Sequence, residues 1–529
     1  MKRVIDYKEQ IGIIFLLVAS AFLRLYKVRE YITFLGDEGR DVLVVYNILH
    51  GHLTLLGPTA SVGGFFMGPI YYYFMTPFLW LFHNDPVGPA IMVGIFGTIT
   101  VWLIYKIGAE FFGKLAGFFA ASLYAVSPLV LSYSRSSWNP NLMPFFSLLS
   151  IYVLYKAITK QNILLFFVFG ILFGVLIQLH YIVLFLAVAV ITYTVVTWAL
   201  KRKEEKKINA IKALTVAFIG FLLGWSPFLA FELRHGFANL QSIVTFIFHS
   251  KETGASANFL ATIWNVFFRL FARLLTDFPP PNQFSLHPPF VFWSWYALSA
   301  ILGLASSGVF IRACYKAYKK DSPKFLMYSA ILFWFAIGIF LFGFYKKPIY
   351  DYYFEFLFPV PFLLVGNFLS SLYSLDKQTG FRKTFYAKRS KFLALGIFLI
   401  LFTVNIQSLP FRYTPNNQVG QTERIAKSVL NRTGGKPFNF ALITGGNSDH
   451  AYRYFFTLWN RVPVTIQNPQ LDPKRQSVTD QLFVVCESLP CSPLGHSLWE
   501  IAGFGRADVA SHWTETPVEI YKLVHYKGN

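Results

Sequence analysis

Residues 163–200 read ILLFFVFGILFGVLIQLHYIVLFLAVAVITYTVVTWAL, and they establish the class of protein. The stretch contains no Asp, Glu, Lys or Arg, and His180 lies between its two apolar halves, 163–179 and 182–200. Each half has the length of about 17 to 25 residues that crosses the roughly 30 Å hydrocarbon core of a bilayer. The stretch therefore predicts a hairpin of two membrane-spanning helices.

Similar apolar runs recur along most of the chain. They cover 11–27, 89–105, 115–133, 142–157, 210–231, 290–311, 325–344, 354–372 and 392–408 in addition to the two above. The composition agrees, because 55% of the 529 residues are hydrophobic and only 14% are charged, against about 25% in a soluble domain. We predict an all-α polytopic membrane protein of about eleven transmembrane helices.

The basic residues follow the positive-inside rule. With a cytoplasmic amino terminus, the predicted inner segments carry 24 Lys and Arg in 69 residues, and the outer loops carry 11 in 139. The count requires 65–82, which contains Pro69 and Pro77, to lie at the membrane interface without crossing it. Because the basic residues alternate with apolar runs, the net charge of +21 indicates a multi-pass protein of the cell membrane and no nucleic-acid partner.

The composition changes near residue 409. From there, strand-like FNFALIT, QLFVVCE and PVEIYKLV surround helix-like HAYRYFFTLW, which predicts a small α/β domain. We expect a membrane core, 1–408, with long outer loops 28–88 and 232–289, and an extracytoplasmic domain, 409–529. Cys486 and Cys491 lie close together in that domain, and the sequence leaves open whether they are bridged.

The most informative polar segment is FLGDEGRDVLVVYNILHGH, residues 34–52, in the first outer loop. Asp37 and Glu38 there have two interpretations. They can cap the helix that follows and complement its dipole. Alternatively, one of them is a general base that deprotonates an acceptor beside the bilayer.

Other polar side chains lie at predicted outer rims. Arg135 and the pair Lys346–Lys347 suit a phosphate, although Arg135 can equally snorkel to headgroups and the lysines can anchor an aromatic belt. Asn139 precedes Pro140 and also reads as a helix start. Standard motifs for nucleotide binding, zinc proteases and serine hydrolases are absent from the sequence.

The order of these features resembles the GT-C glycosyltransferases, and more narrowly the protein O-mannosyltransferase and lipid A aminoarabinose transferase group. The features are a basic amino terminus, one span, Asp-Glu, a helix ending in His-Gly-His, the stretch GPIYYY at 68–73 and a short cytoplasmic Phe-Phe-Gly loop. The resemblance is good over roughly residues 10–200, looser in the later spans, and nearly absent from the tail.

This resemblance implies that an acidic residue of the first outer loop acts at the active site, and the matching position is Asp37, with Glu38 as its neighbour. It also implies a sugar donor linked to polyprenyl or dolichyl phosphate. We expect the donor phosphate to be bound by Arg135, His180, Lys346 and Lys347, although a single His between two apolar runs, as His180 is, can equally be a structural residue. The expected substrate-lining residues are Tyr71, Tyr72, Asn139, Asn141, Asp351 and Tyr352.

The chain departs from the family at two places. Gly68 occupies a position where some members have Lys, and Asn139 and Asn141 occupy a loop where several relatives have Asp. Since Asn coordinates or hydrogen-bonds but cannot act as a base at neutral pH, the sequence leaves open whether a divalent metal assists.

The function implied is transfer of a sugar from a lipid-phosphate donor to an acceptor, whether lipid, glycan or protein, on the extracytoplasmic side. One alternative is a transporter or flippase of lipid-linked saccharide. Transporters usually carry mid-membrane charges and internal repeats, whereas the predicted spans here carry almost no charge and show no detectable repeat. A second alternative, a polymerase or ligase of lipid-linked saccharide, has the same compartment and chemistry and stays open.

Overall fold

The computed structural model describes residues 7–200, 209–254, 258–320, 322–374 and 383–528. The chain divides into two compact units. The first, which we call the helical unit, comprises Met1–Tyr26, Thr54–Phe74 and Ala90–Thr414. The second, which we call the α/β unit, comprises Lys27–Leu53, Met75–Pro89 and Pro415–Asn529. Two segments of the predicted first outer loop thus belong to the same unit as the carboxyl-terminal tail. In that unit the tail begins at Pro415, close to the predicted boundary at residue 409.

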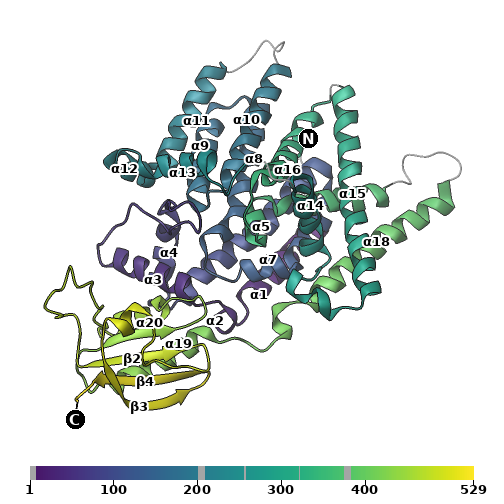
Figure 1. Ribbon diagram of the computed structural model, residues 1–529. Coiled ribbons are helices and arrows are strands. Elements are labelled where there is room, and N and C mark those ends of the chain that lie inside the picture. The colour runs from purple at the N-terminus through teal and green to yellow at the C-terminus, as the bar shows by residue number, and fades with distance from the viewer. Residues whose placement is uncertain (1–6, 201–208, 255–257, 321, 375–382, 529) are drawn as a thin grey trace. The chain divides into compact units, whose positions relative to one another are not determined.

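The helical unit is built from helices, most of them long and apolar (Figure 1). They are α1 (Tyr7–Leu25), α5 (Val87–Phe112), α6 (Lys114–Val126), α7 (Pro128–Tyr133), α8 (Met143–Lys160), α9 (Ile163–Leu179), α10 (Val183–Leu200), α11 (Ala210–Gly224), α12 (Ser226–Arg234), α13 (Ala238–His249), α14 (Phe259–Leu275), α15 (Pro289–Lys319), α16 (Lys324–Leu341), α17 (Pro359–Tyr373) and α18 (Lys383–Gln407). The short 3₁₀ segments η1 (Asn139–Leu142), η2 (Pro281–Leu286), η3 (Phe342–Phe344), η4 (Asp351–Leu357) and η6 (Pro410–Arg412) connect them.

Each of the eleven predicted stretches overlaps a helix. Within the described residues, six unbroken helices are long and apolar enough to cross a membrane, or up to eight if each of two bent pairs is one span. The pairs are α11–α12, bent by 79°, and η4–α17, bent by 60°. The three remaining stretches correspond to α1 and to the shorter apolar helices α6 and α9. The stretch at 65–82 forms α4 (Ile70–Leu81), a helix with Pro77 inside it.

Helices α9 and α11 pack with almost no space between their backbones. The contact is made by Gly170 and Gly174 on α9 and by Gly220 and Gly224 on α11, each spaced four residues apart. An added Cβ at Gly174 would overlap Phe221 O and lie 2.9 Å from Trp225 N. Small residues at this spacing allow the close approach typical of helix pairs in membranes.

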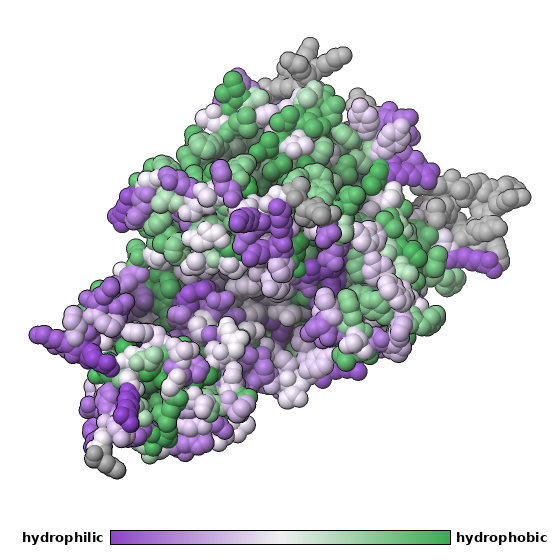
Figure 2. Space-filling model, in the orientation of Figure 1, coloured by the Kyte–Doolittle hydropathy of each residue, from purple (hydrophilic) through white to green (hydrophobic). Residues whose placement is uncertain are grey.

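The outward faces of the helical unit are apolar. On α11, for example, Ile211, Leu214, Phe218, Ile219 and Leu223 are all exposed. Figure 2 shows hydrophobic residues covering much of the surface formed by these helices. Contiguous apolar surface of this extent marks contact with lipid or with another protein, and it agrees with the predicted membrane core.

The α/β unit contains α2 (Val28–Tyr31), α3 (Gly36–Leu49), α19 (Gln418–Leu430), β1 (Asn439–Ile443), α20 (His450–Leu458), β2 (Gln481–Cys486), α21 (Trp499–Ala502), β3 (Ala507–Glu515) and β4 (Val518–His525). The four strands form one sheet in the order β1-β2-β4-β3. Strands β1 and β2 are parallel, whereas the β2–β4 and β4–β3 pairs are antiparallel. All six residues of β2 are buried.

The predicted fold class is confirmed: a helical membrane protein with a small sheet domain near its carboxyl terminus. The predicted strands correspond to β1, β2 and β4, and the predicted helix to α20. Strand β3 was not predicted, because most of its side chains are exposed and lack apolar alternation. Cys486 and Cys491 form a disulfide, which answers the question that the sequence left open.

Candidate active site

The acidic segment of the first outer loop forms the amino-terminal turn of α3. The helix begins at Gly36, so Asp37 and Glu38 lie within its first turn and do not precede it. Glu38 Oε2 accepts a hydrogen bond from Leu35 N at 3.1 Å, and in this way Glu38 satisfies one of the backbone donors left free at a helix start. The capping role therefore belongs to Glu38, and Asp37 makes no cap.

Asp37 is accessible, whereas Glu38 is half-buried and Asp41 is buried. The Asp37 side chain is 60% exposed, and its Oδ1 accepts from Arg40 Nη1 at 2.9 Å. Asp41 is fully buried and accepts from the same guanidinium at 2.8 Å and 3.0 Å. Arg40 thus joins two carboxylates and holds Asp37 on the outer side of the helix.

Glu38 has the perturbed acidity expected at a reaction centre. Burial raises the pKa of Glu38 to about 7, and the charges of Asp41 and Asp37 act in the same direction. Hydrogen bonds from its own backbone and from Leu35 oppose this shift. A carboxyl with a pKa near neutrality suits proton transfer. Thus α3 carries one accessible carboxylate and one carboxyl that titrates near pH 7.

In the helical unit, His180 lies in a cluster of tyrosines between α9 and α10. Its ring stacks on Tyr181 at 4.5 Å between centroids, and Tyr352 and Tyr353 lie at 5.9 Å and 5.5 Å. Burial lowers the pKa of His180 to about 3, so the ring is neutral at pH 7. His180 Nδ1 accepts from Ile182 N at 3.2 Å, which places the ring proton on Nε2.

The tyrosine cluster extends to the predicted lysine pair. The hydroxyl of Tyr181 is 3.2 Å from that of Tyr345, which in turn donates to Tyr353 at 3.5 Å. Burial raises the pKa of Tyr181 and of Tyr345, so both hydroxyls stay protonated. The structure thus brings His180 and Tyr352 together, and the cluster ends at the residue before Lys346.

The predicted amides and tyrosines of the outer loops are buried and hold the backbone. Asn139 Nδ2 donates to Leu179 O at 2.5 Å, immediately before His180. Asn141 Nδ2 donates to Tyr133 O and Ser136 O at 2.8 Å and 2.7 Å. Tyr71 and Tyr72 are also buried, and the Tyr71 hydroxyl lies 2.8 Å from Ser137 Oγ. These contacts fix the loop between α7 and α8.

Arg135 is buried and bound to backbone. Its Nη1 and Nη2 donate to Leu23 O at 2.6 Å and to Tyr26 O at 2.8 Å, and the guanidinium lies 4.8 Å from the centroid of Phe411. These contacts fix the end of α1 against the loop after α7. A role for Arg135 in phosphate binding stays a prediction.

Asp351 lies between two arginines of α14. Its Oδ1 accepts from Arg269 Nη2 at 2.5 Å and Nε at 3.0 Å, and its Oδ2 accepts from Arg273 Nε at 3.1 Å. The carboxylate is only 15% exposed. Its contacts therefore fix η4 to α14, and its predicted place beside the substrate is untested.

Two cavities adjoin at Tyr345. The first, of about 340 Å³, is apolar and is lined by residues including Phe65, Ile182, Phe185, Phe246, Leu341 and Tyr345. The second, of about 430 Å³, is lined by Asn258, Ala261, Thr262, Asn265, Arg269, Tyr345, Lys346, Lys347 and Ile349. Lys347 Nζ pairs with Glu252 Oε1 at 2.9 Å.

A short backbone bridge joins residues that line the two cavities. Gly254 N donates to Phe344 O, and Lys346 N donates to Glu252 O, both at 2.9 Å. Thr253 and Gly254 line the apolar cavity, whereas Lys346 and Lys347 line the polar one. Sequence reasoning missed Arg269, Asn258 and Asn265, because they lie on or next to α14, about 80 residues before the lysines.

The described residues contain no group of three or more His, Cys, Asp and Glu side chains that could hold a metal ion. In α3 the guanidinium of Arg40 occupies the side of Asp37 and Asp41 where a cation would bind. The described residues thus offer no cluster of carboxylates of the kind that usually binds a divalent metal. A role for a divalent metal stays a prediction, which chelation before an activity assay would test.

Comparisons with known proteins identify similar folds. A family model described as dolichyl-phosphate-mannose-protein mannosyltransferase matches residues 67–225, and no curated protein sequence matches the chain. The structure of ArnT from Cupriavidus metallidurans bound to undecaprenyl phosphate has a TM-score of 0.60 at 12% identity, covering 96% of this chain and 97% of that one. The same protein in the apo state has a TM-score of 0.59 at 12% identity, covering 97% and 98%.

The oligosaccharyltransferase of Archaeoglobus fulgidus, tethered with an acceptor peptide containing the NVT sequon, has a TM-score of 0.51 at 13% identity. The match covers 91% of this chain and 70% of the oligosaccharyltransferase chain. At these identities the likeness is one of fold, and it extends over nearly the whole chain in ArnT. The resemblance predicted from the sequence is confirmed: the chain has the GT-C fold of these membrane glycosyltransferases and is similar, over residues 67–225, to the dolichyl-phosphate-mannose-protein mannosyltransferases.

Proposed function

We propose that this protein is an integral membrane glycosyltransferase that moves a sugar from a polyprenyl- or dolichyl-phosphate donor to an acceptor on the extracytoplasmic side. The observation that carries the proposal is the pair of adjoining cavities in the helical unit. An apolar cavity next to a basic polar one matches a ligand that has a hydrocarbon chain and a phosphate. The ArnT structure, which shares the fold, was solved with undecaprenyl phosphate.

In this proposal the apolar cavity receives part of the isoprenoid chain, and the polar cavity receives the phosphate. Lys346, Lys347 and Arg269 supply positive charge to the polar cavity, and Asn258, Asn265 and Thr262 supply hydrogen-bonding groups. Tyr345 lines both cavities. Cations fixed around a departing phosphate stabilise the charge that develops on it in the transition state.

The proposed chemistry is a single displacement at the anomeric carbon. Asp37 accepts the proton of the acceptor hydroxyl or amine, the acceptor oxygen or nitrogen bonds to the anomeric carbon, and the bond from that carbon to the phosphate oxygen breaks. The electron pair leaves with the lipid phosphate. The lysines hold the phosphate in this scheme. Because His180 is neutral with its proton on Nε2, it contributes a hydrogen-bond donor and no positive charge.

The lysine pair provides the first test. Changing Lys346 and Lys347 together to Ala should raise the donor KM by about tenfold or more, since each hydrogen bond to a charged group contributes about 1.5 to 3 kcal/mol. The turnover at saturating donor should fall less. The measurement is transfer of labelled sugar from a panel of polyprenyl-phosphate sugars by purified protein, with release of the lipid phosphate followed in the same assay.

Lys320→Ala, at an exposed position just after α15, is the matched control and should leave the donor KM unchanged. An unchanged KM in the double variant would place the phosphate elsewhere. Movement of intact lipid-linked saccharide without release of lipid phosphate would support the flippase alternative instead.

We further propose that the amino terminus is cytoplasmic and the α/β unit extracytoplasmic. The basic asymmetry of the loops supports this orientation, and the Cys486–Cys491 disulfide favours an oxidising compartment. A cysteine introduced at exposed Lys474 should react with a membrane-impermeant maleimide in intact cells. A cysteine at Lys320 should react only after the membrane is opened, and the reverse pattern would invert the proposed topology.

A further inference from the structure

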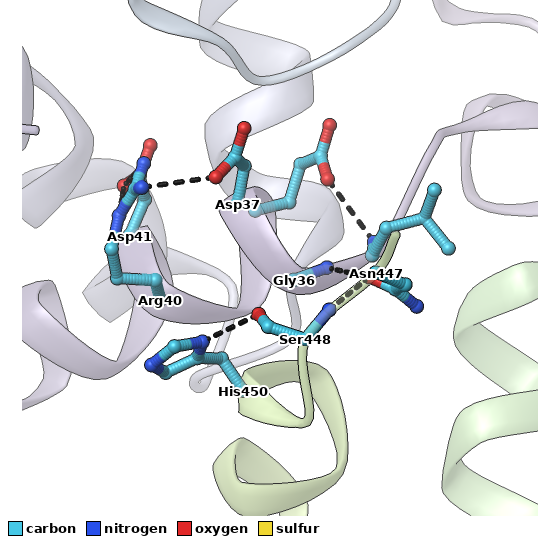
Figure 3. A network of polar contacts seen from close by, with 9 residues as sticks. Gly36, Asp37, Arg40, Asp41, Asn447, Ser448 and His450 are labelled. Carbon is cyan, nitrogen blue, oxygen red and sulfur yellow. Dashed lines mark hydrogen bonds and ion pairs between the residues drawn. The ribbon is translucent and has the colours of Figure 1, made fainter. Parts of the chain in front are cut away.

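The loop between β1 and α20, residues 444–449, contacts the first turn of the acidic helix α3. Asn447 Oδ1 accepts from Gly36 N at 2.7 Å and from Ser448 N at 2.8 Å. Figure 3 shows Asn447 and Ser448 beside the start of the helix. A single side chain from the tail thus satisfies a backbone N–H at the amino terminus of α3. The first N–H groups of a helix have no partner within the helix itself.

Asn447 is itself held in place by the end of β2. Its Nδ2 donates to Glu487 Oε2 at 3.2 Å, and the same oxygen accepts from Thr444 Oγ1 at 2.9 Å. Glu487 Oε1 accepts from the Tyr452 hydroxyl at 2.8 Å. Glu487 follows directly after β2, so the hydrogen bond to Gly36 is connected to the sheet through one carboxylate.

The two glycines of the Gly-Asp-Glu-Gly segment make room for this contact. An added Cβ at Gly36 would lie 2.8 Å from Ser448 N, and one at Gly39 would lie 2.5 Å from the Cα of Ala451. Backbone at these distances cannot move aside as a flexible side chain can. The two glycines that flank Asp37 and Glu38 therefore pack directly on the tail.

The contact with the tail does not cover the accessible carboxylate of Asp37. In Figure 3 the Asp37 carboxylate points away from Ser448 and His450, which lie on the opposite side of the helix. On the contact side, Ser448 Oγ lies 2.6 Å from His450 Nδ1. The tail thus fixes the backbone beneath Asp37 without occupying the space into which that side chain projects.

We propose that the loop 444–449, through Asn447 and its support Glu487, is a positioning element for Asp37 and so makes the carboxyl-terminal domain part of the catalytic apparatus. This inference rests on the proposed function, in which Asp37 is the general base. Asn447 and Glu487 are positioning residues, because they act through the backbone of α3. A base displaced by about 1 Å can lose about a hundredfold in rate, so small movements of this turn matter.

The test is a double-mutant cycle on the full-length protein. Asn447→Ala should lower kcat by about tenfold to a hundredfold and leave the donor KM unchanged. In the Asp37→Asn background it should cause no further loss, because the base that Asn447 positions is already gone. Losses that multiply in the double variant would overturn the proposal, since they would show that Asn447 acts independently of Asp37.

Two further variants address folding. Asn447→Asp combined with Glu487→Gln reverses the hydrogen bond between these two side chains and also the one from Thr444 Oγ1, whose hydroxyl can accept as well as donate. The pair keeps the acceptor for Gly36 N, so it should restore most of kcat. Gly39→Ala should lower kcat like Asn447→Ala. Gly308→Ala on α15, where an added Cβ meets no atom within 4 Å, is the matched helical-glycine control and should leave kcat unchanged. Thermal unfolding and protease resistance identify any variant that is simply misfolded.

The outcomes separate the two proposals. If Asp37→Asn turns over normally, the proposed base is wrong and the positioning role falls with it. If Asp37→Asn is inactive while folded Asn447→Ala has normal kcat, only the positioning role is wrong.

Discussion

Asp37→Asn is expected to lower turnover by about 10² to 10⁴-fold, the usual cost of removing a general base, in a protein that stays folded and binds donor. The structure indicates that this substitution removes the charge of Asp37 with little effect on folding. Asp37 does not cap α3, because Glu38 does. Asn keeps the oxygen that accepts from Arg40, so the stability lost is that of one exposed ion pair, about 0.2 to 1 kcal/mol.

The measurement compares single-turnover rates with equilibrium donor binding. Glu30→Gln is the matched control, because Glu30 forms an exposed i,i+3 ion pair with Lys27 in the same unit, as Asp37 does with Arg40. Glu38→Gln in parallel shows which acid carries the effect, since the carboxyl with a pKa of about 7 belongs to Glu38. Near-normal turnover of Asp37→Asn would remove it from the mechanism.

The helices of the membrane core could be predicted because apolar length is a local property of the sequence. Their breaks were harder to predict. The pair α11–α12 bends at Trp225, before Pro227, and η4–α17 bends at Phe358, before Pro359. Proline at a helix start is compatible with either a new helix or a continued one. The sequence indicates where such a break can occur but not whether the chain uses it.

The candidate site was predicted in part, for a related reason. The acidic pair and the lysine pair are local motifs, and the sequence placed both in outer loops. Their partners come from far along the chain: Asn447 contacts Gly36, and Arg269 shares a cavity with Lys347. No spacing rule connects such residues. The glycines around Asp37 and Glu38 were the one feature of the sequence that indicated the contact with the tail, because paired glycines in a helix allow close approach of another backbone.

Asp351→Asn is expected to destabilise the helical unit by on the order of 3 kcal/mol, the cost of breaking a buried ion pair by removing one partner. Two guanidiniums, Arg269 and Arg273, converge on this carboxylate. Without its charge, both remain in a largely buried position with one neutral acceptor between them. Unfolding in mixed micelles, followed for wild type and variant, measures the difference in the free energy of unfolding.

Glu110→Gln is the control for this prediction. It breaks the ion pair with Lys156 in the same unit, where the acid is 32% exposed, so it should cost about 1 kcal/mol or less. Asp351 was predicted from the sequence to line the substrate site, and the same experiment tests that role. Because Asp351 fixes Arg269, which lines the polar cavity, a loss of stability should bring a modest rise in donor KM. A large rise in KM with unchanged stability would instead mean that Asp351 contacts the substrate itself and that the two arginines are held well enough without it.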